Sequence, residues 1–362
     1  MVIKSLKLKN YRNYDLLDIT FDPGTNILYG DNAQGKTNIL EALYLSGTTK
    51  SHRGTKDRDI IQFGYEESHI ETIVEKRGVH FQTDIHLKKN SPKGIAIDKV
   101  PIRRAGELFG IVHFVFFSPE DLNIIKEGPA GRRRFIDLEL SQLDRIYLSN
   151  LSNYNRVINQ RNSLLKDIYA QKNLMETLDV WDMQLISYGN KILERRKKFI
   201  DQINEIISDI HFKLTGKKER ISLSYEESIG NMTFEDALAK YRDRDIRMKS
   251  TTSGPHRDDI CFMTDKGLDI RKFGSQGQQR TAALALKLSE IELVKKSIGD
   301  TPVLLLDDVL SELDKHRQNY LLDSIHDIQT IITCTGLDEF VNNRFSINKI
   351  FHIKNGHAAN AN

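Results

Sequence analysis

The stretch that decides the fold spans residues 27–45 and reads ILYGDNAQGKTNILEALYL. Its first residues are apolar and favour a strand, and a glycine-containing loop follows from residue 30 to residue 35. Beyond the loop the apolar side chains recur at helical spacing, at Ile39, Leu40, Leu43 and Tyr44. The stretch therefore predicts a strand, a loop and a helix in direct succession.

The loop fits the phosphate-binding pattern G-x-x-x-x-G-K-[ST]. Backbone N–H groups of such a loop cradle phosphates at a helix N-terminus, where the helix dipole favours negative charge. A chance match is the alternative, and the flanking strand and helix argue against it. We expect a nucleoside triphosphate, ATP, with Lys36 on its β- and γ-phosphates and the Thr37 hydroxyl on Mg²⁺. The expected nucleotide-binding residues are Gly30, Asp31, Asn32, Ala33, Gln34, Gly35, Lys36 and Thr37.

A second motif, Asp307-Asp308, follows the apolar run from Pro302 to Leu306. Carboxylates at the end of a buried parallel strand lie where open α/β sheets bind ligands. We expect Asp307 to hold Mg²⁺ and Asp308 to orient or deprotonate an attacking water, which with Lys36 makes Asp308 catalytic. An ordinary acidic loop is the alternative.

A third motif, Ser275-Gln276-Gly277-Gln278, precedes a predicted helix. After the phosphate loop and before Asp307, it resembles the signature motif of ABC ATPases, S-x-G-Q. The resemblance implies that Ser275, Gly277 and Gln278 contact the nucleotide of a second subunit. Residues 311–314 then resemble the D-loop, which adds Asp314 to the nucleotide-binding residues. An ordinary helix cap with a glycine is the alternative.

The chain between these motifs predicts a helical insertion. From about residue 138 to residue 215 there is no proline and only Gly189 as an internal glycine, and apolar residues keep a helical period. Continuous apolar strands elsewhere alternate with helices, which favours a parallel sheet covered on both faces. We expect an α/β fold: an ABC-type ATPase head with a mixed sheet and flanking helices, plus a largely helical arm. The expected parts are the N-terminal head 1–137, the arm 138–250, the C-terminal head 251–355 and a disordered tail 356–362.

Six blocks resemble the RecF proteins, a family of bacterial recombination mediators. They are NYRNY at 10–14, KSHR at 50–53, FSPEDL at 117–122, GRRRFID at 131–137, SGPHRDD at 253–259 and LDDVLSELD at 306–314. The resemblance runs from residue 1 to about residue 355. It implies a DNA-binding ATPase of recombinational repair, replication and the SOS response to DNA damage. Such a protein dimerises on ATP, acts with RecR and RecO at single-strand gaps or junctions, and promotes RecA loading. Arg12 matches a position where SMC-like heads place an arginine near the phosphates.

Two departures from transporter ATPases favour a slow switch over a motor. Asp308 replaces the usual glutamate, and the predicted strand that contains Thr333, Cys334 and Thr335 lacks the switch histidine. We therefore expect a weak ATPase that acts as a switch, and the DNA binding implied by the resemblance adds stimulation of this ATPase by DNA. Alternatives are an ABC subunit that energises transport, which DNA-stimulated turnover would exclude, and an interaction module that binds ATP without hydrolysing it.

Basic clusters mark the expected DNA contacts, although the net charge of +3 alone argues for nothing. The clusters are Arg132, Arg133 and Arg134, and Arg195, Arg196, Lys197 and Lys198. Solvated helix faces are the alternative, or, for the first cluster, structural pairing with acids. The two cysteines suggest reduced, buried thiols, and no run is long enough for a membrane helix, so we expect a cytoplasmic protein.

Overall fold

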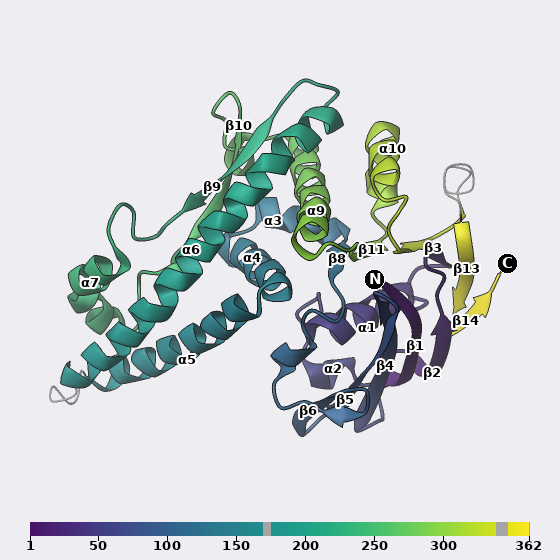
Figure 1. Ribbon diagram of the computed structural model, residues 1–362, viewed down its shortest axis with the longest axis horizontal. Helices are drawn as coiled ribbons and strands as arrows, with labels where there is room; N and C mark the ends of the chain where they lie inside the picture. Colours follow the sequence, from purple (N-terminus) through teal and green to yellow (C-terminus); the bar gives the residue numbers. More distant parts are fainter. Residues whose placement is uncertain (169–174, 338–346, 362) are drawn as a thin grey trace. The chain divides into compact units, whose positions relative to one another are not determined.

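The computed structural model describes residues 1–168, 175–337 and 347–361 (Figure 1). The chain forms two compact units, one from Met1–Asp121 with Lys287–Asn362 and the other from Leu122–Leu286. The expected boundaries after residues 137 and 250 differ from these, since both fall inside the second unit. Helix α4 (Pro129–Leu143) runs through the first boundary without a break. Beyond the second boundary, residues 259–264 form a strand that pairs with residues 221–226 of the same unit.

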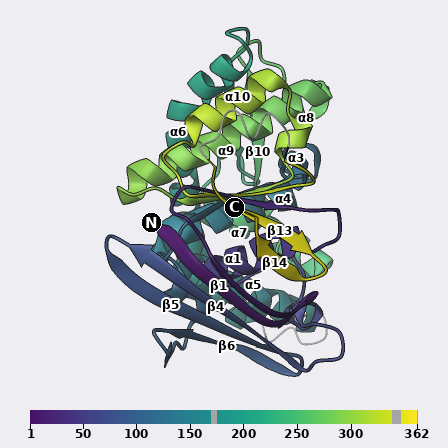
Figure 2. The ribbon, with the colours of Figure 1, turned by 90° about the vertical axis from the view of Figure 1, so that its right-hand side faces the viewer.

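The first unit contains an antiparallel sheet built from the N-terminal third of the chain (Figure 2). Its strand order is β2-β1-β4-β5-β6-β7. The strands are β1 (Val2–Tyr11), β2 (Tyr14–Thr20), β4 (Glu67–Lys76), β5 (Val79–Lys88), β6 (Ser91–Ile97) and β7 (Val100–Pro101). Alternate residues such as Leu6, Leu8 and Ile70 are buried, which is why one face packs and the other stays polar.

A second, mixed sheet carries the motifs, in the order β14-β13-β3-β12-β11-β8. The strands are β3 (Thr25–Tyr29), β8 (Phe114–Phe117), β11 (Val303–Asp307), β12 (Thr330–Cys334), β13 (Ile347–Lys354) and β14 (His357–Asn360). All neighbours pair in parallel except β14 with β13. Helix α1 (Lys36–Thr48) contacts β4 and β5 of the first sheet and β8, β11 and β12 of the second. It therefore lies between the sheets, which confirms the predicted mixed sheet with flanking helices.

Smaller helices complete the first unit: α2 (Asp57–Ile60), the 3-10 turns η1 (Ala105–Leu108), η2 (Pro119–Asp121) and η5 (Leu310–Glu312), and α10 (Lys315–Ser324). Helix α9 (Gln276–Ile298) begins in the second unit and ends in the first. The predicted disordered tail is wrong for residues 357–360, which form β14, while Asn362 lies outside the described residues. The turn between β13 and β14 is Asn355-Gly356, with φ of 47° and 73°, a sequence that strongly favours a two-residue hairpin.

The second unit is mostly helical, as predicted. Its elements are α3 (Leu122–Lys126), α4, α5 (Arg145–Asp167), α6 (Met175–Leu214), β9 (Ile221–Glu226), α7 (Phe234–Met248), η4 (Pro255–Arg257), β10 (Asp259–Thr264) and α8 (Ile270–Phe273). Helices α5 and α6 run side by side (Figure 1), and α7 packs on both. The apolar stripe of α6 is buried at Leu178, Leu185 and Ile192. A Cβ on Gly189 would lie 2.4 Å from the Phe234 ring, so this glycine allows the close packing of α6 on α7.

Candidate nucleotide site

The carboxyl ends of three parallel strands meet at one edge of the second sheet. In register, Tyr29 of β3 pairs with Cys334 of β12, and Thr333 of β12 pairs with Asp307 of β11. The loop 30–35 therefore leaves the sheet two strands away from the Asp307-Asp308 pair. This is the edge where α/β sheets bind ligands, and it brings the first two predicted motifs together.

The loop between β3 and α1 has the backbone of an anion-binding nest. Gly30, Ala33 and Gly35 have φ of 150°, 62° and 112°. Such positive values turn the backbone so that successive N–H groups can face one anion. Lys36 is almost fully buried, and its Nζ donates to the carbonyls of Gly30 at 2.6 Å and Asp31 at 2.9 Å. The Lys36 ammonium thus lies back over the loop.

Thr37 and Asp307 are in direct contact. The Thr37 hydroxyl donates to Asp307 Oδ1 at 2.8 Å, and the Thr333 hydroxyl donates to the same oxygen at 2.7 Å. A hydroxyl and a carboxylate are hard oxygen ligands of the kind that Mg²⁺ prefers, and Mg²⁺ needs only one or two of them beside phosphate and water. Within the described ranges no group of three or more His, Cys, Asp or Glu side chains is placed to hold a metal by itself. The pair therefore fits a metal that arrives with a nucleotide.

Asp308 has an unusual backbone for a residue with a side chain, with φ of 51°. Its N–H donates to the Thr333 hydroxyl at 3.0 Å, and its carbonyl accepts from Ser311 Oγ at 2.8 Å. Burial raises the pKa of the Asp308 carboxyl; Lys36 opposes this shift and Asp307 adds to it. Strained residues of this kind persist where the surroundings fix them, and a raised pKa suits a proton acceptor.

The β1–β2 turn lies against the loop. Asn13 Nδ2 donates to the Gln34 carbonyl at 2.9 Å, and the Tyr14 hydroxyl donates to the Gly35 carbonyl at 3.0 Å. Arg12, which is predicted to lie beside the phosphates, holds the Glu41 carboxylate of α1 with Nε and Nη2, at 2.8 and 2.7 Å. Sequence reasoning did not single out Asn13, Tyr14 or Glu41. Only the position of the NYRNY block hinted at a role for the first two.

The signature residues belong to the second unit, whereas the phosphate loop belongs to the first. Ser275 Oγ accepts the N–H of Gln278 at 3.3 Å, and Gln278 Oε1 accepts the N–H of Ser275 at 2.9 Å. This reciprocal capping box opens α9 and leaves Ser275 and Gly277 exposed. The helix cap, which is the alternative interpretation of the signature motif, is therefore present. Asp314 caps α10, where its Oδ1 accepts the Arg317 N–H at 3.0 Å.

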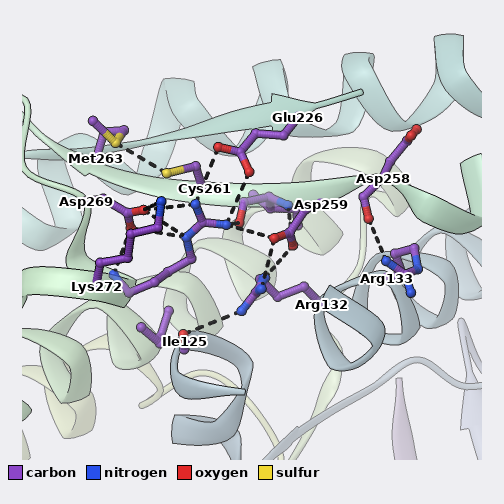
Figure 3. A network of polar contacts seen from close by, with 12 residues as sticks. Ile125, Arg132, Arg133, Glu226, Asp258, Asp259, Cys261, Met263, Asp269 and Lys272 are labelled. Carbon is purple, nitrogen blue, oxygen red and sulfur yellow. Dashed lines mark hydrogen bonds and ion pairs between the residues drawn. The ribbon is translucent and has the colours of Figure 1, made fainter. Parts of the chain in front are cut away.

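The prediction that the first basic cluster contacts DNA is partly wrong, because two of its side chains belong to a network of polar contacts within the second unit (Figure 3). Arg132 is buried, forms two hydrogen bonds to the Asp259 carboxylate at 2.5 and 2.9 Å, and donates to the Glu127 carbonyl at 2.6 Å. Arg133 is half-buried and donates to the Asp258 carbonyl at 2.7 Å, while Arg134 is exposed. The prediction of a DNA contact is therefore wrong for Arg132, whose charge is used inside the unit.

The second basic cluster also contains both buried and exposed side chains. Arg196 is buried, pairs with Asp137 at 2.7 Å and donates to the Pro255 carbonyl at 2.6 Å, so its predicted DNA contact is also wrong. Arg195 pairs with Asp144 at 2.8 Å. Lys197 and Lys198 are exposed, and Lys197 pairs with Glu227 at 2.7 Å. Because buried guanidinium groups need carboxylate partners, acids elsewhere in the unit decide which basic residues remain at the surface.

Comparisons with known proteins decide the family. The RecF/RecN/SMC N-terminal domain family matches residues 2–359. The "DNA replication and repair protein RecF" of Agathobacter rectalis is 64% identical and covers 98% of both chains. The protein of the same name from Lachnospira eligens is 61% identical over 100% of both. This chain belongs to the RecF family.

Solved RecF structures agree with this assignment. The "recombination mediator protein RecF-ATP in RecFOR pathway" superposes with a TM-score of 0.92 at 34% identity, covering 99% of this chain and 97% of that one. An Smc head domain from Pyrococcus furiosus has a TM-score of 0.57 at 17% identity, covering 99% and 95%, and shares the fold. The predicted membership of the RecF family and the SMC-like ATPase head are thus confirmed. The described helices include none long and apolar enough to cross a membrane.

Proposed function

We propose that this RecF-family chain is an ATP-dependent DNA-binding protein of recombinational repair and replication. It dimerises on ATP and reopens on slow hydrolysis. The observation that carries the proposal is the 2.8 Å hydrogen bond between Thr37 and Asp307, which are 270 positions apart in the chain. It joins the start of α1 to the end of β11 beside a phosphate loop. A RecF relative of the same fold has been solved with ATP, which supports ATP as the nucleotide.

The loop residues have distinct tasks in this proposal. Lys36 Nζ exchanges its two carbonyl contacts for phosphate oxygens, which are stronger acceptors for an ammonium group. Thr37 and Asp307 would hold Mg²⁺, which when bound neutralises charge on the β- and γ-phosphates. Asp308 orients the attacking water and accepts its proton. The carboxylate of Asp308 lies one methylene farther back than that of a glutamate, which favours slow turnover.

A second subunit supplies the signature residues. Gly277 lies in the first turn of α9, and a Cβ there would meet only Ser275 Oγ, at 3.9 Å, among the described residues. A glycine in a helix costs about 0.5–1 kcal/mol relative to alanine. Since the subunit itself does not require a glycine here, we infer that a group outside it approaches closely. The phosphates held by a partner's loop fit this exposed helix start.

DNA is bound through its backbone in this proposal. Of the predicted contacts, Arg134, Lys197 and Lys198 remain exposed and can neutralise phosphates without reading sequence. The family resemblance implies gaps or junctions as targets, RecR and RecO as partners, and RecA loading as the outcome. A titration of DNA binding against salt tests this part, because a binding constant that does not change with salt contradicts phosphate neutralisation.

Sedimentation velocity with ATP and Mg²⁺ tests the dimer. We expect the wild-type chain to shift from monomer to dimer, and Ser275→Arg to stay monomeric. Ser149→Arg, an exposed serine on α5 of the same unit, is the matched control and should dimerise normally. A wild-type chain that remains monomeric, or a Ser275→Arg variant that dimerises equally well, refutes the proposal. DNA-stimulated ATP hydrolysis separates it from transport-energising and non-hydrolysing alternatives.

A further inference from the structure

The C-terminal hairpin contacts the phosphate loop at two points. A Cβ on Gly30 would lie 2.3 Å from the carbonyl oxygen of Ile353 in β13, so loop and strand are in close contact. At the hairpin turn, the Asn355 N–H donates to Gln34 Oε1 at 2.7 Å. The Gly356 N–H donates to the Gln34 carbonyl at 3.4 Å. A segment more than 300 positions later in the chain thus packs beneath the loop.

The β1–β2 turn meets the same residue. The Gln34 carbonyl also accepts from Asn13 Nδ2 at 2.9 Å, so both turns donate to Gln34. The turns touch each other as well, since a Cβ on Gly356 would lie 2.3 Å from the Asn13 carbonyl oxygen. Gln34 therefore joins the phosphate loop to both the β1–β2 turn and the β13–β14 turn.

This bracing matters because the loop is strained. Ala33, next to Gln34, has φ of 62°, a conformation that costs a residue with a side chain on the order of 1 kcal/mol or more. Such a conformation persists only where neighbouring contacts fix it. A loop held in this shape before ligand binding loses less conformational entropy on binding.

We propose that Asn355 and Gly356 are positioning residues of the nucleotide site, which hold Gln34 and through it the phosphate loop in its binding conformation. The inference rests on the proposed binding of ATP. It gives a role at the nucleotide site to Gly356, the first residue of the segment 356–362 that was expected to be a disordered tail.

The chain offers a matched control for Gly356→Ala. The β4–β5 hairpin has the same two-residue turn, Arg77-Gly78, with φ of 52° and 77° against 47° and 73° for Asn355-Gly356. A Cβ on Gly78 meets nothing within 4 Å. Gly78→Ala and Gly356→Ala therefore carry the same backbone strain, and only Gly356→Ala pushes against Asn13.

We expect Gly356→Ala to raise the Kd for ATP with Mg²⁺ about tenfold, and Gly78→Ala to change it less than about twofold. In DNA-stimulated hydrolysis, the KM for ATP should rise with Gly356→Ala while kcat changes less than about twofold. Gln34→Met, which removes the side-chain acceptor at similar volume, should weaken ATP binding about threefold. The double variant Gln34→Met/Gly356→Ala should bind more tightly than the product of the two single effects predicts, because both act on one contact.

The outcomes of these measurements separate the proposed binding of ATP from the proposed role of the Asn355-Gly356 turn. If the wild-type chain fails to bind ATP, the proposed function fails and this inference fails with it. If the wild type binds ATP and Gly356→Ala binds as Gly78→Ala does, only the inference is overturned. A fall in kcat with KM unchanged also overturns it. Should Gly356→Ala fail to fold, Gln34→Met carries the test, and unchanged ATP affinity in that variant refutes the role of the turn.

Discussion

Replacing Glu41 by Gln tests whether the ion pair with Arg12 holds the β1–β2 turn against α1. The fully buried carboxylate accepts from Arg12 at 2.8 and 2.7 Å and from Ser51 Oγ at 2.5 Å. Burial alone would raise the pKa of Glu41, but hydrogen bonds from Arg12 and Ser51 outweigh it and lower the pKa. Because Gln keeps one acceptor but turns an NH₂ group toward the other donors, the variant loses the ion pair and leaves a donor unpaired.

The expected free-energy cost of Glu41→Gln follows from the burial of Glu41 and Arg12. Removing one partner of a buried ion pair costs about 3–5 kcal/mol. Arg12 keeps 20% of its side chain exposed and can reach water, which reduces the expected local cost to about 2–3 kcal/mol. Since the pKa of Glu41 is lowered in the folded protein, its stabilisation is present above the unfolded value, about 4.3, and is lost as the pH falls through the folded pKa. The experiment therefore belongs at neutral pH.

Amide hydrogen exchange measured by mass spectrometry reports this local cost. In Glu41→Gln we expect exchange in α1 and the β1–β2 turn to quicken about 30- to 150-fold. The control is Glu71→Gln, which breaks a partly exposed pair with Lys7 at 3.2 Å and should quicken exchange less than about threefold. Equal, small effects in both variants would refute the reasoning.

Three other predictions follow from single contacts. Asp307→Asn should weaken ATP binding about tenfold with Mg²⁺ and leave it unchanged with EDTA, measured by calorimetry. Arg132→Met should destabilise the second unit by about 2–4 kcal/mol and Arg134→Met by less than about 1, read from Trp181 fluorescence in urea; similar losses would contradict the burial argument. Burial lowers the pKa of His256 to about 4. The unfolded chain, with a His pKa near 6.5, binds the proton first, so stability falls as the pH drops from about 6.5 to 4, by up to about 3 kcal/mol. His256→Gln should lose less over that range in the same assay.

Local patterns made the core of the site predictable. The strand, loop and helix around Lys36 are continuous in sequence, so spacing alone indicates the phosphate loop. Asp307 follows an apolar run that only a buried strand explains. Contact between Thr37 and Asp307 then follows from parallel pairing, because β12 is the single strand between β3 and β11.

Contacts between residues far apart in the sequence could not be predicted from local patterns. Arg132 and Arg134 are alike in the sequence, but Arg132 is buried against Asp259, 127 positions away, whereas Arg134 is exposed. Arg196 is buried for the same reason, since Asp137 and Tyr147 lie on other helices. The β13–β14 hairpin is different, because the Asn355-Gly356 pair is itself a turn signal in the sequence. Its contact with Gln34 required the fold.

A mixing experiment tests the shared nucleotide site most directly. Lys36→Ala removes the phosphate lysine, and Ser275→Arg blocks the signature, so neither variant alone forms a complete site. A mixed dimer contains one complete site, with Lys36 from one subunit and Ser275 from the other. In sedimentation velocity with ATP and Mg²⁺, each variant alone should stay monomeric, and an equimolar mixture should dimerise. A mixture that stays monomeric while the wild-type chain dimerises, or a single variant that dimerises alone, would contradict the account.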